Sequence, residues 1–112
     1  GLDITIRGAE DRSFRKSPDG YTVLGPWMGT ADEIADPGKL NLEISVNGER
    51  RQSSNTSYMI LDCAALIEMA SSFYTLYPGD VIGSGTVGTG CLLELTGGKG
   101  PWLEPEDVVV RR

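Results

Sequence analysis

Residues 77–86 read YPGDVIGSGT, a turn followed by a short apolar run and a glycine-rich end. Pro78–Gly79 forms the turn signal, and Val81–Ile82 is predicted to be a short strand. Because glycine lets a backbone approach a ligand closely, backbone amides together with Ser84 and Thr86 can contact a small anion. The segment therefore predicts the wall of a binding site. The alternative interpretation is a strand that ends in a mobile glycine loop.

The composition of the 112 residues limits the class of protein. With 39% hydrophobic and 23% charged residues, the chain can form one globular core and is too short for two. Fifteen glycines and six prolines favour short elements, mostly strands, joined by tight turns. A net charge of −6 argues against a nucleic-acid partner, which needs a basic surface. No apolar run is long enough to span a bilayer, so we expect a soluble, cytoplasmic protein without a membrane partner.

The residue types that most often bind zinc or act as general base are scarce. Cys63 and Cys91 lie far apart and lack the paired spacing of a zinc site, which predicts two buried free thiols, with a disulfide as the alternative. Histidine is absent, so any acid–base chemistry must use other groups or another segment. The chain also begins without Met, directly in a predicted strand, which suggests a part of a longer protein.

The N-terminal residues 2–7 alternate between apolar and polar side chains, the period of a half-buried strand. Asp3, Thr5 and Arg7 share the polar face. This face is either solvated or places a metal-binding Asp3 beside an Arg7 that binds a substrate carboxylate. The polar loop that follows carries Lys16, whose ammonium would stabilise a developing enolate. A surface lysine without a role is the alternative.

Two further regions have clear local patterns. Residues 42–46 alternate between apolar and polar and lead into Asn47–Gly48, the kind of turn that closes hairpins. Thr56 or Ser57 can cap a helix predicted over residues 58–73, where apolar side chains recur at spacings of three and four. This apolar stripe predicts a helix that packs against the core.

The remaining strands are predicted at residues 21–27, 91–95 and 108–110. Residues 83–88 spell G-x-G-x-x-G, the pattern of dinucleotide-binding loops. That pattern requires a helix after the loop, whereas residues 91–95 read as a strand. The sequence therefore predicts no nucleotide site.

Several short motifs occur in a characteristic order along the chain. They are Asp3-Ile4-Thr5-Ile6-Arg7, Lys16-Ser17, Leu24-Gly25-Pro26-Trp27, Val46-Asn47-Gly48-Glu49, Gln52, Asn55-Thr56 and Met59-Ile60, together with the glycine loop. In this order they resemble the C-terminal part of the fumarylacetoacetate hydrolase family. The resemblance covers nearly the whole chain but only about the second half of the family's catalytic domain.

The resemblance implies a fold, a chemistry and a partner. The implied fold is α+β and consists mostly of strands, which form a mixed β-roll or β-sandwich. It has one main packed helix at about 58–73 and is a single domain over residues 1–112. The parent protein would be an enzyme that depends on Mg²⁺, Mn²⁺ or Ca²⁺. It would hydrolyse, decarboxylate or isomerise a small anionic 2-oxo acid or β-dicarbonyl (a diketo acid) through an enolate-like intermediate. Members are commonly homodimers.

The family's functional positions map onto individual residues here. Asp3 corresponds to a metal ligand, and Arg7 and Lys16 correspond to catalytic and substrate-binding groups. The substrate-binding positions of the glycine loop are Ser84, Gly85 and Thr86.

The chain departs from the family pattern at some positions. Leu2, Gly8 and Val87 replace the usual Asn, Asp and Pro. Glu106 stands where glycine is usual, and because glycine permits positive φ, the turn geometry there is in question.

Two further metal carboxylates of the family lie on a Glu-x-Glu before the position of Asp3, and this chain has no such segment. We therefore expect the 112-residue chain alone to be inactive. The alternative function is a noncatalytic β-rich binding or assembly module that keeps the fold without the metal site.

Overall fold

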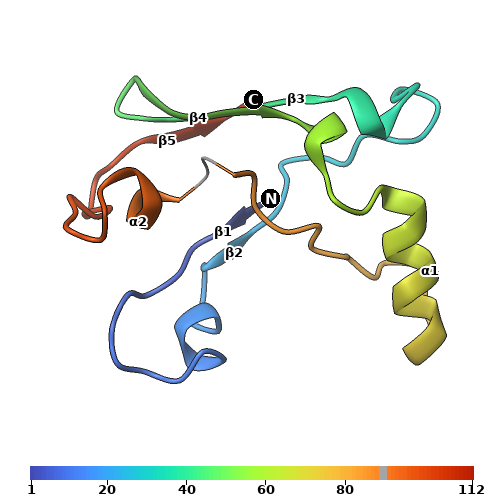
Figure 1. Cartoon of the computed structure of the whole chain (residues 1–112), viewed down its shortest axis with the longest axis horizontal. Coiled ribbons are helices and arrows are strands. Elements are labelled where there is room, and N and C mark those ends of the chain that lie inside the picture. Colours follow the sequence, from blue (N-terminus) through green and yellow to red (C-terminus); the bar gives the residue numbers. More distant parts are fainter. Residues whose placement is uncertain (89–90) are drawn as a thin grey trace. The chain divides into compact units, whose positions relative to one another are not determined.

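The structure is a computed structural model that describes residues 1–88 and 91–112. Its contacts divide the chain into two compact units, Gly1–Ala35 and Asp36–Arg112, and each is described by itself (Figure 1). Short strands and a few helices make up the chain, in agreement with the predicted α+β class. No helix of the described residues is long and apolar enough to cross a membrane. A single family domain over residues 1–112 stays a prediction.

The first unit is a short antiparallel pair of strands joined by a loop. Strand β1, Leu2–Asp3, pairs with β2, Thr22–Val23, and the Ile4 amide continues the pairing by donating to the Tyr21 carbonyl at 2.9 Å. Both strands are shorter than predicted. The Ile6 amide donates to a carbonyl of the loop instead of a strand partner, which ends the ladder early.

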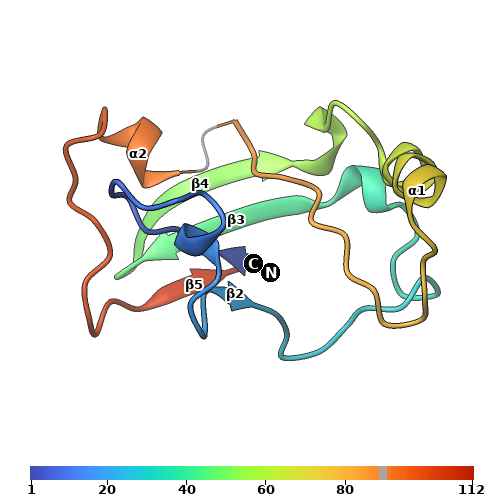
Figure 2. The same ribbon diagram turned by 90° about the horizontal axis from the view of Figure 1, so that it is seen from below.

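The second unit contains an antiparallel sheet with strand order β4-β3-β5 within the described residues (Figure 2). Its strands are β3, Asn41–Val46, β4, Glu49–Asn55, and β5, Val109–Arg111. Asn47 and Gly48 join β3 to β4 with φ values of 52° and 82°, the positive angles that two-residue hairpin turns require. The predicted hairpin and last strand are confirmed.

Side-chain contacts tie the hairpin turn to the segment before β5. Asn47 Nδ2 donates to Asp107 Oδ1 at 2.7 Å, and the Val108 amide donates to Asn47 Oδ1 at 2.9 Å. Asp107 Oδ2 accepts from the Glu104 amide at 2.8 Å. The Glu104 N–H, and then the Asn47 amide, lower the pKa of Asp107 because they stabilise its ionised form. We refer to the Asn47, Asp107 and Val108 contacts as the clasp.

Glu106 lies next to the clasp in the left-handed region, with φ of 77°. The turn therefore keeps the geometry that glycine would favour, and the glutamate adopts it at a cost in backbone strain.

We expect Glu106→Gly to stabilise the protein by about 0.5–1 kcal/mol. A Cβ at positive φ costs about 1–2 kcal/mol, and the greater freedom of glycine in the unfolded chain offsets part of the gain. Thermal unfolding measures the change. Glu106→Ala removes the charge but keeps the Cβ, so it should melt close to the parent. A glycine variant that melts at or below the temperature of Glu106→Ala would contradict this account.

The predicted helix begins later than the pattern indicated. Thr56–Tyr58 forms a 3₁₀ turn, η3, and helix α1 spans Cys63–Phe73. Asp62 caps α1, because its Oδ1 accepts from the Ala65 amide at 2.8 Å. Thr56 does not cap a helix, since its hydroxyl donates to the Pro37 carbonyl at 2.7 Å.

The helix predicted near 58–73 forms over Cys63–Phe73, but the described residues do not bury its apolar face as predicted. No residue of α1 is buried, and on its apolar stripe Ile67 is 52% and Phe73 76% exposed. Among the described residues Gln52, 8% exposed, is the one buried side chain, and no apolar side chain is buried. Apolar periodicity shows which face of a helix seeks burial, and it does not show what covers that face.

The thiol prediction holds in one respect and fails in another. Neither Cys63 nor Cys91 forms a disulfide, as predicted. Contrary to the prediction of buried thiols, Cys63, the first residue of α1, is exposed and Cys91 is half-buried.

Two short strands predicted around the glycine loop are absent from the described residues. Val81–Ile82 is not part of a strand, and residues 91–95, predicted as a strand, contain the one-turn helix α2, Leu92–Leu95. Leucine and glutamate favour helix, and the segment has no β-branched residue to favour a strand. A helix of four residues without a preceding strand still does not make a dinucleotide fold.

Candidate functional site

A short helical turn brings the predicted lysine back to the N-terminal segment. The 3₁₀ turn η1 spans Phe14–Lys16, inside the loop between β1 and β2. The Ile6 amide donates to the Arg15 carbonyl at 3.1 Å, which attaches this turn to the residues after β1. Arg15 Nε in turn donates to the Glu10 carbonyl at 2.6 Å. The loop is thus held beside the strand, and Lys16 lies at its end.

Lys16 contacts two of the three residues that share the polar face. Its Nζ forms an ion pair with Asp3 Oδ2 and donates a hydrogen bond to Thr5 Oγ1 at 3.0 Å. The Lys16 and Asp3 side chains are 51% and 64% exposed, so the ion pair contributes little to stability. The Lys16 ammonium thus lies between a carboxylate and a hydroxyl and stays accessible.

The other predicted residues are placed as follows. Arg7 is exposed and lies on the same segment, two residues after Thr5. Ser84, Gly85 and Thr86 are exposed residues of the second unit, and Gly85 has the positive φ, 92°, that a glycine loop provides. Their substrate contacts remain predictions. The sequence pattern placed Thr5 on the polar face without giving it a role, and its contact with Lys16 is the feature that the pattern missed.

A divalent metal needs more oxygen ligands than this cluster supplies. Mg²⁺ and Ca²⁺ take six or more oxygens, usually several of them from carboxylates or water. Residues 1–88 and 91–112 contain no group of three or more His, Cys, Asp or Glu side chains placed to hold a metal. Asp3 offers one carboxylate and is paired with Lys16. These residues alone therefore do not form a complete metal site.

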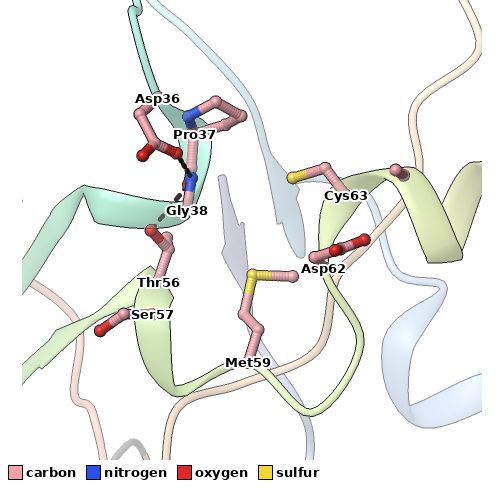
Figure 3. Close-up of a pocket in the computed structure, with 9 residues that line it drawn as sticks. Asp36, Pro37, Gly38, Thr56, Ser57, Met59, Asp62 and Cys63 are labelled. Atoms are coloured by element: carbon pink, nitrogen blue, oxygen red, sulfur yellow. Dashed lines mark hydrogen bonds between the residues drawn. The ribbon is translucent and has the colours of Figure 1, made fainter.

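A separate hollow of about 480 Å³ lies in the second unit, near the start of α1 (Figure 3). Figure 3 shows Asp36 and Cys63 on opposite sides of the space, with Met59 below it. The residues that line it are Asp36, Pro37, Gly38, Thr56, Ser57, Met59, Asp62, Cys63 and Ala64.

The carboxylates of this hollow already have structural partners. Asp36 Oδ1 accepts from the Gly38 amide at 2.9 Å, and its Oδ2 pairs with Lys39 Nζ at 2.7 Å. Lys39, and then the Gly38 amide, lower the pKa of Asp36, and Asp36 raises the pKa of Lys39. Asp62 caps α1. The hollow includes no residue predicted for the site, and its polar groups hold the local backbone.

The whole chain is similar to known proteins. Residues 1–112 match the family described as fumarylacetoacetate (FAA) hydrolase C-terminal. The solved structure of maleylpyruvate hydrolase from Sphingobium sp. SYK-6 superposes with a TM-score of 0.82 at 35% identity, covering 98% of this chain and 37% of that chain.

Curated relatives include enzymes with different names. The maleylpyruvate hydrolase of Aquipseudomonas alcaligenes is 64% identical over 86 residues, which are 77% of this chain and 30% of the relative. The mitochondrial oxaloacetate tautomerase Fahd2a of Rattus norvegicus is 43% identical over 84 residues, 75% of this chain and 27% of the relative. The 4-hydroxyphenylacetate degradation bifunctional isomerase/decarboxylase of Salmonella dublin is 45% identical over 89 residues, 75% of this chain and 21% of the relative.

The chain spans less than a third of the length of these curated relatives. The family match nevertheless extends from the first residue to the last, and the superposition covers nearly all of the chain at an identity well above that of chance similarity. The order of the short motifs and the similarity in fold to the maleylpyruvate hydrolase structure point to the same family. The chain therefore belongs to the fumarylacetoacetate hydrolase family, whose C-terminal model it matches over residues 1–112.

Proposed function

We propose that these 112 residues are part of a longer, divalent-metal-dependent enzyme that acts on a small anionic 2-oxo acid or β-dicarbonyl. The reaction would be hydrolysis, decarboxylation or isomerisation through an enolate-like intermediate. Relatives named for maleylpyruvate and oxaloacetate support this proposal, because both compounds are 2-oxo acids. The observation that carries it is the contact of Lys16 with Asp3 at the matching motif positions.

Each residue of the proposed site has a distinct task. Lys16 would place its ammonium where the enolate oxygen gains negative charge, which stabilises the transition state more than the bound substrate. Arg7 would bind a substrate carboxylate, because a guanidinium can donate two parallel hydrogen bonds to it. The hydroxyls and amides of Ser84, Gly85 and Thr86 would complete the substrate contacts.

Asp3 would contribute one ligand to a Mg²⁺, Mn²⁺ or Ca²⁺ ion, and the remaining ligands would come from outside these 112 residues. The chemistry that such an ion would supply when bound is Lewis-acid polarisation of substrate oxygens. We further infer that the complete domain has the mixed β-roll of the family and that the enzyme is a homodimer. The exposed apolar stripe of α1 supports a larger assembly, in which other parts of the protein cover that face.

We expect the full-length protein to turn over acylpyruvates or oxaloacetate with Mg²⁺ or Mn²⁺ and to lose this activity in EDTA.

Asp3→Asn should weaken metal affinity about tenfold or more, since it removes a charged ligand. Calorimetric titration of the metal measures the affinity directly. Asp19→Asn, a matched change of an exposed aspartate in the same unit, should bind metal like the parent. Turnover that is unaffected by EDTA would contradict the proposal.

A further inference from the structure

We propose that Thr5 is a positioning residue for Lys16: its hydroxyl holds the lysine ammonium beside the N-terminal segment without neutralising its charge. The contact is Lys16 Nζ to Thr5 Oγ1 at 3.0 Å. The inference rests on the proposed function, in which the Lys16 ammonium stabilises an enolate oxygen. It adds a role for a residue that supplies neither a charge nor a metal ligand.

The two partners of Lys16 act differently on its charge. The Asp3 carboxylate attracts the ammonium strongly but opposes its field at any anionic substrate nearby. The Thr5 hydroxyl is a neutral acceptor, so it fixes the nitrogen and leaves the positive charge intact. When Asp3 is drawn to another cation, Thr5 is the partner that keeps Lys16 in place. An ammonium has three N–H groups, and bonds to these two partners leave one for a substrate oxygen.

The backbone explains why position 5 can perform this task. The Ile6 amide bonds to the Arg15 carbonyl at 3.1 Å, so the residue after Thr5 is joined to the residue before Lys16. This bond sets the distance between the two backbones. The long, flexible lysine side chain then needs a local acceptor to select one of its many conformers, and a threonine hydroxyl at this position meets that requirement.

Acetylation of individual lysines tests the contact independently of activity. The full-length protein is treated with limiting sulfosuccinimidyl acetate, and mass spectrometry gives the rates at Lys16 and at Lys39. Lys39 is the internal reference, because it is also exposed and paired with an aspartate. We expect Thr5→Val to raise the ratio of the Lys16 rate to the Lys39 rate about two- to fivefold, since the amine loses one hydrogen bond. Thr5→Ser, which retains the hydroxyl, should restore the parent ratio.

Steady-state kinetics test the consequence for catalysis, with whichever of the acylpyruvate or oxaloacetate substrates the parent turns over. Thr5→Val should lower kcat about three- to tenfold and change KM less than twofold, and Thr5→Ser should recover most of kcat. Thr22→Val is the matched control, because it makes the same change on the exposed neighbouring strand β2. It should alter neither the acetylation ratio nor kcat.

The outcomes separate this inference from the proposed function. An unchanged acetylation ratio in Thr5→Val overturns the inference, whether or not the protein is active. A raised ratio with unchanged kcat in an active protein also overturns it, since Thr5 would then hold Lys16 without serving the reaction. Loss of kcat that Thr5→Ser does not recover points to altered packing and overturns it as well. A parent without metal-dependent turnover overturns the proposed function, and the acetylation ratio still decides whether Thr5 holds Lys16.

Discussion

Replacing Lys16 with methionine in the full-length protein is expected to lower kcat about 100- to 1000-fold, the usual effect of removing one group that stabilises an oxyanion. KM should change far less, because the contact strengthens mainly as negative charge develops in the transition state. Methionine has nearly the length of lysine and no charge, so the change removes the ammonium and little of the volume. Initial rates over a range of substrate concentrations, at saturating Mg²⁺, measure both constants.

Lys39→Met provides the matched control for this experiment. Lys39 is an exposed lysine paired with Asp36 in the second unit, and it lies outside the motifs quoted in the sequence analysis. Its replacement should leave kcat at the parent value. An unchanged kcat in Lys16→Met would show that Lys16 does not take part in catalysis. A raised KM with an unchanged kcat would show that Lys16 contributes to substrate binding alone.

The 112-residue chain by itself is expected to show no turnover of acylpyruvates or oxaloacetate above background, with or without Mg²⁺. The proposed reaction needs a divalent ion, and Asp3 is the one metal ligand that we propose from these residues. A single carboxylate binds Mg²⁺ weakly, because Mg²⁺ takes six oxygen ligands.

The matched comparison is the full-length protein at the same molar concentration and metal concentration. Its turnover shows that substrates and assay are adequate, and circular dichroism of the shorter chain shows whether its helix and sheet are present. Metal-dependent turnover by the 112 residues alone would contradict the expectation. It would mean that the chain assembles a complete site, for example between two copies.

The parts of the fold that could be predicted from the sequence are those fixed by neighbouring residues. The hairpin is the best example, because Asn47 and Gly48 both take positive φ and their types alone favour that turn. The start of α1 could not be predicted in this way. Thr56 is a good capping residue, but its hydroxyl bonds to Pro37, which is distant in sequence, and Asp62 caps the helix instead.

The candidate site shows the same division between local and distant causes. The family motifs identified Asp3 and Lys16, and the structure places their side chains in contact. Alternation along residues 2–7 put Thr5 on the polar face, yet nothing in that pattern indicates a lysine eleven positions later. The hydrogen bond between the Ile6 amide and the Arg15 carbonyl closes this loop. Nearly any residue type can form such a backbone bond, so the sequence does not reveal it.

The clasp has a consequence for the order in which the second unit folds. Asn47 and Asp107 are separated by 60 positions, whereas β3 and β4 are joined by a two-residue turn. Closing a short loop costs far less chain entropy than closing a long one, and hairpins form in microseconds. We therefore expect β3 and β4 to pair first and β5 to dock later, when the clasp forms. Until β5 docks, the edge of β3 that it will cover can pair with another chain. Because the clasp holds β5 against β3, it shortens the time in which this edge is open and the unit can aggregate.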